Sequence, residues 1–168
     1  MRRAERDRAF EDFVRARRTH LRRIAYALCG SWDRAEDLVQ AALEKAYVAW
    51  PRIRSAEAAE GYVRTILVRS NIDESRRPWR REQSSAELPD TAVPSADTGV
   101  EERTALFTAI QSLPTMQRAV IVLRHWLDLP VTQVAAELGI SEGTVKSHSS
   151  RGLATLREVL DAEVEALR

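Results

Sequence analysis

Residues 131–150 constrain the fold more than any other stretch of the chain. They read VTQVAAELGISEGTVKSHSS, in which two short apolar patterns flank Gly139. This spacing predicts a helix-turn-helix, with the glycine in the turn and Ser141 as the N-cap of the second helix. The two helices are expected to share a small core made of Val131, Val134, Leu138, Ile140 and Val145.

The second of these helices carries hydroxyls, a lysine and a histidine in its first turns. In helix-turn-helix proteins, the early side chains of this helix meet base edges while flanking ones meet phosphates. Lys146 and Arg151 can donate to guanine or phosphate, and Thr144 and Ser147 can bond either. The exposed early positions are predicted to be Glu142, Thr144, Lys146, Ser147, His148, Ser150 and Arg151. The alternative is an ordinary helical hairpin.

The rest of the chain also has helical periodicity, with no strand pattern. Helices are predicted over about 5–28, 33–50 and 55–77 in the front half, and over 101–112, 115–127, 131–138 and 142–164 in the back half. Gly30 should end the first helix, and Asp33 should cap the second. The predicted fold class is all-α, with two small helical bundles.

The charge distribution divides the chain into three parts. Residues 1–81 hold 19 Lys and Arg against 12 Asp and Glu, residues 82–102 hold six acids and no Lys or Arg, and residues 103–168 hold seven of each. The middle stretch is rich in Pro, Ser and Thr, which is typical of a linker. We therefore expect a front domain over 1–81, a flexible acidic linker over 82–100 and a back domain over 101–168.

The composition argues against several functional classes. The single cysteine, Cys29, allows neither a disulfide framework nor a thiol metal site. No segment resembles a signal peptide or is apolar enough to span a bilayer, so we expect a cytoplasmic protein without membrane insertion. His20, His125 and His148 lie on different predicted elements. We therefore expect no catalysis, no cofactor and no metal.

The front half combines cations with aromatic rings, which is what a single-stranded nucleic-acid surface needs. Within about thirty residues stand Trp50, Arg52, Arg54, Tyr62, Arg64, Arg69, Arg76, Arg77, Trp79, Arg80 and Arg81. The rings could also be core residues and the arginines a solvated face. The second helix instead exposes acids, which could dock a basic partner or simply complement the helix dipole.

Order and spacing in both halves point to a family. The strings DRAEDLVQAALEKAYVAW, GYVRTILVRSNIDESRR and LPTMQRAVIVLRHWLDLPVTQVAAELGISEGTVKSHSSRGLATLREVL stand in this order. Together they resemble regions two and four of an extracytoplasmic-function sigma factor, the smallest class of bacterial RNA polymerase sigma subunit. The resemblance implies a sigma factor that binds core RNA polymerase and directs promoter-specific initiation of transcription.

The resemblance also implies roles for residues of the front domain. The acidic second helix would bind the clamp helices of the polymerase's largest subunit through Asp33, Glu36, Asp37, Leu38 and Gln40. Unstacked bases of the minus-ten element would be captured by Trp50, Arg52, Ile53, Tyr62, Arg69 and Ser70, with Arg76 and Arg77 on backbone phosphate. Many relatives have Arg-Asn where this chain has Val68 and Arg69, which bears on minus-ten preference.

The resemblance assigns the back domain to the minus-thirty-five duplex. Its reading residues would be Thr144, Lys146, Ser147, Ser150 and Arg151. The same domain would pack on the polymerase flap tip, and the acidic linker would thread toward the catalytic centre. An anti-sigma factor is expected among the partners, besides core polymerase and promoter DNA.

Two other functional classes remain open from the residues alone. A helix-turn-helix regulator of the response-regulator kind also carries TVKSH on its recognition helix and would bind duplex DNA without polymerase. A helical adaptor would bind no nucleic acid at all. A salt-sensitive affinity for DNA in the presence of core polymerase would separate the adaptor from the sigma factor.

Overall fold

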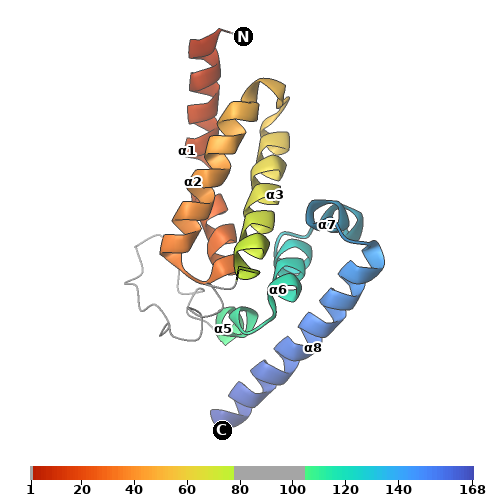
Figure 1. Ribbon diagram of the computed structural model, residues 1–168. Helices are drawn as coiled ribbons and strands as arrows, with labels where there is room; N and C mark the ends of the chain where they lie inside the picture. The colour runs from red at the N-terminus through yellow and green to blue at the C-terminus, as the bar shows by residue number, and fades with distance from the viewer. Residues whose placement is uncertain (1, 78–104) are drawn as a thin grey trace. The chain divides into compact units, whose positions relative to one another are not determined.

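The computed structural model describes residues 2–77 and 105–168, and every regular element within them is helical (Figure 1). The chain divides into two compact units, Met1–Asp73 and Glu74–Arg168, and the division falls in the last turn of the third helix. The predicted all-α class with two helical bundles is therefore confirmed. The predicted boundaries at 81 and 100, with the linker between them, lie outside the described residues.

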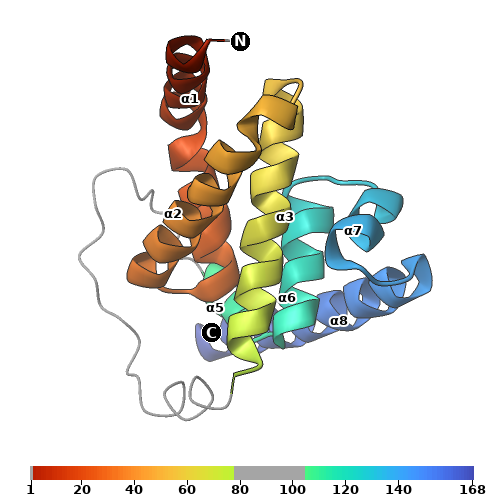
Figure 2. The same cartoon turned by 45° about the horizontal axis from the view of Figure 1, so that its top comes forward.

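The front unit consists of three long helices joined by short connections. They are α1 (Arg3–Cys29), α2 (Trp32–Ala49) and α3 (Ala56–Ser75), with a 3₁₀ turn at Trp50–Arg52 before α3. Figures 1 and 2 both show the three helices side by side. Apolar residues at three- and four-residue spacings meet between them because each helix buries one face. The fully buried members of this core include Leu21, Ala25, Val39, Ala42, Val63 and Leu67.

The ends of the front helices follow from local capping. Gly30 has φ 76°, and its N–H donates to the Tyr26 carbonyl at 2.8 Å, so the predicted end of α1 is confirmed. The predicted cap at Asp33 is wrong. Ser31 is the N-cap of α2, because its extended backbone lets its hydroxyl accept the Arg34 N–H. Asp33 lies in the first turn, where its charge complements the helix dipole.

Within its described residues 105–168, the back unit has four α-helices and one π-helical turn. The helices are α5 (Ala105–Gln111), α6 (Thr115–Ile121), α7 (Val131–Leu138) and α8 (Glu142–Ala166). The predicted single helix over 115–127 is correct only in part, since α6 passes into a π-helical turn at Val122–Trp126. One core of this unit contains the buried residues Ala109, Leu113, Ile121 and Leu156.

Two contacts fix α6 within the back unit. The Arg118 guanidinium donates to the carbonyls of Gln111 and Leu113 at 2.9 Å each, so it satisfies carbonyls at the end of α5. Gly152 allows α8 to cross α6 closely, because a Cβ atom at this position would lie 2.8 Å from the Ile121 Cγ1 atom. Helix α8 is therefore supported from beneath in the middle of its length.

The predicted helix-turn-helix is formed by α7 and α8. Gly139 adopts the left-handed conformation with φ 66°, and the Ser141 hydroxyl accepts the Thr144 N–H at 3.1 Å, as predicted. Val134 and Val145 are completely buried, whereas Val131, Leu138 and Ile140 are half-buried. The two helices thus present the first turns of α8 at the surface of the back unit.

Candidate nucleic-acid interface

The first half of α8 separates outward-facing from inward-facing side chains. Val145 and Gly152 are buried. All five predicted reading residues are exposed: Thr144, Lys146, Ser147, Ser150 and Arg151. No acidic residue occurs between Glu142 and Glu158, so the exposed cations have no acid on this part of the helix. The surface can therefore donate hydrogen bonds to the acceptors of a DNA groove and to phosphates.

Two further contacts hold the reading half of α8 in place. The Thr144 and Ser141 hydroxyls lie 2.8 Å apart, so Thr144 belongs to the cap as well as to the exposed face. His125 Nε2, in the π-helical turn, lies 2.8 Å from the Ser149 hydroxyl oxygen. Partial burial, and secondarily the Arg124 cation, lower the pKa of His125 below its usual value. His148 is half-buried.

The predicted minus-ten residues near the 3₁₀ turn are partly packed. The Trp50 ring meets Phe10 edge-on, with 5.3 Å between centroids, and is tilted against Phe13 at the same distance. Ile53 also packs against the front core, whereas Arg52 is exposed. The segment therefore presents an anchored ring close to an exposed cation.

The remaining predicted minus-ten residues are spread along α3 and its end. Tyr62 is 40% exposed, and Arg69 follows seven residues later, so both lie on one face of the helix. Ser70 is half-buried, while Arg76 and Arg77 are exposed just beyond the last helical residue. Because each residue of a helix advances by about 1.5 Å, these side chains form a line and not a cluster.

The five residues of the predicted polymerase-docking face of α2 differ in exposure and in ion pairing. Asp33, Asp37 and Gln40 are exposed. Glu36 forms ion pairs with Arg22 and, at 3.3 Å, with Arg18, both on α1. Leu38 is only 3% exposed and lies in the front core, so it supports this face from beneath.

Sequence reasoning missed several of these contacts because their partners are far apart in the chain. Arg18 and Arg22 lie on α1 and Glu36 lies on α2, so no local pattern pairs them. The same holds for Tyr47, which bonds side chains in the first turns of α1. For this region, the combination of arginines with aromatic rings from Trp50 onward indicated a functional surface but not these contacts.

The described residues offer no metal centre and no bilayer-spanning element. Within 2–77 and 105–168, no three His, Cys, Asp or Glu side chains are grouped as metal ligands. No helix in these ranges has the length and apolar character needed to cross a membrane. The Cys29 thiol is buried and donates to the Ser31 carbonyl at 3.3 Å.

Comparison with known proteins identifies the family. The family model for sigma-70 region 2 matches residues 13–81, and that for sigma-70 region 4 matches residues 103–156. The RNA polymerase sigma-E factor of Streptomyces avermitilis is 36% identical over 91% of this chain and 86% of its own length. The ECF RNA polymerase sigma factor SigM of Mycobacterium tuberculosis is 30% identical over 90% of this chain and 77% of its own.

The chain belongs to the ECF sigma factors of the sigma-70 family. Its predicted function, promoter-specific initiation of transcription with RNA polymerase, is thereby confirmed at the level of the family. Among solved structures, the Bartonella quintana sigma factor RpoE in complex with the anti-sigma factor NepR has a TM-score of 0.73 and 28% identity. That match covers 91% of this sigma factor and 97% of the RpoE chain.

Proposed function

We propose that the back unit of this sigma factor reads the minus-thirty-five duplex through the first half of α8. The observation that carries the proposal is the separation of buried Val145 and Gly152 from five exposed hydrogen-bonding side chains on the same turns. Lys146 and Arg151 would donate to guanine or phosphate. Thr144, Ser147 and Ser150 are short enough to contact the backbone or base edges at close range.

The front unit would hold the separated minus-ten strand. The exposed ring of Tyr62 and the half-buried ring of Trp50 would stack on bases, and Ile53 would take part in the same capture. Arg52 and Arg69 would follow the strand. Ser70 would contribute a hydrogen bond, and Arg76 and Arg77 would meet phosphates of the adjoining DNA.

Binding to core polymerase would use the exposed acids of α2. Asp33, Asp37 and Gln40 would meet the clamp helices of the largest subunit, with Leu38 supporting them. Glu36 would join this contact only by exchanging its arginine partners on α1. The back unit would dock on the flap tip, and the linker 82–100 would thread toward the catalytic centre.

Holding both DNA elements would shift the equilibrium of promoter opening. Unstacking a base costs a few kcal/mol, and stacking on an aromatic ring returns roughly 1–3 kcal/mol. A few captured bases are therefore enough to favour the open form. The sigma factor itself would need no cofactor or metal and would perform no catalysis, since the polymerase makes the phosphodiester bonds.

Regulation would occur by sequestration in the cytoplasm. A sigma factor that resembles this chain at 28% identity is solved with an anti-sigma factor bound. We therefore propose that an anti-sigma factor also restrains this chain, and that the chain itself does not insert into the membrane.

Run-off transcription with core polymerase tests the proposal. Lys146→Ala and Arg151→Ala should each lower transcription from a dependent promoter about tenfold at limiting protein, the loss expected for one good groove contact. Arg157→Ala, an exposed arginine six residues farther along α8, is the matched control and should change it little. If core polymerase with wild-type protein starts no transcript on any genomic fragment of the host, the proposal fails. Binding of a specific duplex without polymerase would instead favour an ordinary helix-turn-helix regulator.

A further inference from the structure

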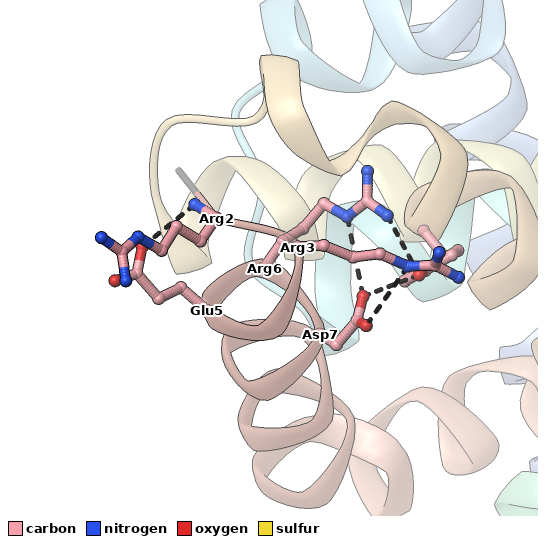
Figure 3. A network of polar contacts seen from close by, with 6 residues as sticks. Arg2, Arg3, Glu5, Arg6 and Asp7 are labelled. Carbon is pink, nitrogen blue, oxygen red and sulfur yellow. Dashed lines mark hydrogen bonds and ion pairs between the residues drawn. The ribbon is translucent and has the colours of Figure 1, made fainter.

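The first turns of α1 are bonded to the end of α2, immediately before the 3₁₀ turn. The Tyr47 hydroxyl accepts a hydrogen bond from Arg6 Nη2 at 3.2 Å and donates one to Asp7 Oδ1 at 2.7 Å. The Arg6 guanidinium also lies over the Tyr47 ring, 5.2 Å from its centroid. Figure 3 shows Arg6 and Arg3 both directed toward Asp7. We call Arg6, Asp7 and Tyr47 the polar anchor.

An aromatic contact lies next to the polar anchor along α1. Phe10 meets the Tyr47 ring at 5.1 Å and the Trp50 ring at 5.3 Å, edge-on in both cases. Phe13 continues the contact to Trp50. Edge-to-face pairs at these distances are favourable beyond the area that they bury. Two rings of α1 therefore hold the Trp50 ring at the edge of the front core.

The spacing along α1 explains why these contacts act together. Arg6, Phe10 and Phe13 stand at i, i+4 and i+7, so they lie on one face of the helix. Tyr47 and Trp50 are three residues apart at the end of α2, and one helix face therefore meets both. The match to the region 2 family model covers residues 13–81, so Arg6, Asp7 and Phe10 precede it, whereas Tyr47 lies within it.

We propose that the first turns of α1 position the segment 50–53 for capture of the minus-ten strand. The inference rests on the proposed function of that segment. A binding segment that is ordered in advance loses less conformational freedom when it captures bases. Within the segment, the Ile53 N–H donates to the Trp50 carbonyl at 3.1 Å. Within the polar anchor, Arg6 and Asp7 hold Tyr47, which stands three residues before Trp50. The anchor thus sets where this turn begins.

Tyr47→Phe in the full-length protein tests the proposal directly, because it removes the hydroxyl and keeps the ring. The amide of Ile53 should then exchange its hydrogen about threefold to tenfold faster, the change expected for loss of one or two hydrogen bonds. The Leu67 amide in the front core should be unaffected. In the holoenzyme, permanganate reactivity of minus-ten thymines should fall by a similar factor, while affinity for core polymerase is unchanged.

Two further variants separate positioning from other effects. Asp7→Asn keeps the side-chain shape but removes the negative charge that Arg3 and Arg6 contact, so it should also speed the exchange of Ile53. Arg8→Gln removes an exposed cation from the same turn of α1, outside the polar anchor, and should change neither measurement. Unchanged Ile53 exchange in both Tyr47→Phe and Asp7→Asn would overturn the proposal. So would an equal loss of thymine reactivity in Arg8→Gln, because the turns would then act by attracting DNA.

The two proposals fail in distinguishable ways. If the wild-type holoenzyme exposes no minus-ten thymines, the proposed function of the segment is wrong, and with it the inferred effect on promoter opening. Normal thymine reactivity in wild type, together with unchanged reactivity in Tyr47→Phe and Asp7→Asn, overturns the positioning role alone.

Discussion

The two candidate DNA surfaces differ in how they share residues with the protein core. On α8, exposed reading side chains alternate with the buried residues that hold the helix, so one set can change without the other. In the segment 50–53, Trp50 packs its ring on Phe10 and Phe13 and is still only half-buried. A duplex offers a fixed groove that a rigid helix can enter. Separated bases have no such shape, and the protein has to supply the surface on which they rest.

This comparison predicts its largest effect at Trp50. Trp50→Ala should lower the free energy of unfolding of the front unit by about 2 kcal/mol, less than for a fully buried tryptophan because the ring is half-exposed. It should also lower permanganate reactivity at the minus-ten element. Arg151→Ala should stay within about 0.5 kcal/mol of wild-type stability while losing transcription. Urea titration monitored by NMR signals from each unit measures the two unfolding free energies.

If Trp50→Ala leaves the front unit as stable as wild type, the two DNA surfaces do not differ in the way described. The ring would then serve DNA alone, as Arg151 does. Equal destabilisation by Trp50→Ala and Arg151→Ala would also contradict this difference, because the reading face of α8 would then be part of a core as well.

The sequence was sufficient for helices whose signals are local. The bounds of α7 match the prediction, and the predicted start of α8 is confirmed, because Pro130, Gly139 and Ser141 act on their own neighbours. The cap of α2 was misassigned because Ser31 and Asp33 are both good caps. Gly30 decides between them, since its left-handed backbone places Ser31 at the extended position that begins the helix.

Features that depend on distant partners could not be predicted. The π-helical turn after α6 arises where the Leu127 N–H bonds the Val122 carbonyl, five residues back, and no local signal marks it. The pairing of Glu36 with α1 is equally non-local. For the candidate site, residue types and order predicted the surfaces, and the described structure adds which side chains also belong to a core.

A smaller effect is expected from the two serine caps, one in each unit. Ser141→Ala should cost about 1 kcal/mol of unfolding free energy in the back unit. Ser31→Ala should cost less in the front unit, because its bond to the Arg34 N–H is 3.4 Å long against 3.1 Å for Ser141. Ser141→Ala also removes the contact that positions the Thr144 hydroxyl on the reading face. Of the two variants, only Ser141→Ala should therefore weaken binding to minus-thirty-five duplex in the holoenzyme.

Duplex binding by the two cap variants shows whether Thr144 acts separately from the stability of its unit. If Ser31→Ala weakens duplex binding as much as Ser141→Ala does, the effect comes from general loss of stability. Thr144 would then have no separate part in reading the duplex. Urea titration of each unit and a duplex-binding measurement with core polymerase give the two values.

The smallest expected effect is a pH dependence confined to the back unit. Partial burial, with a smaller contribution from Arg124, lowers the pKa of His125 in the folded protein, so the unfolded chain binds this proton more readily. The contribution of His125 to stability is therefore fully present above the unfolded pKa and is lost as pH falls through the lower folded pKa. Urea midpoints of the back unit should fall over this window, and His125→Gln should flatten the decline. Arg124→Gln should leave most of it, because burial is the larger cause. A decline that persists undiminished in His125→Gln would assign it to another group.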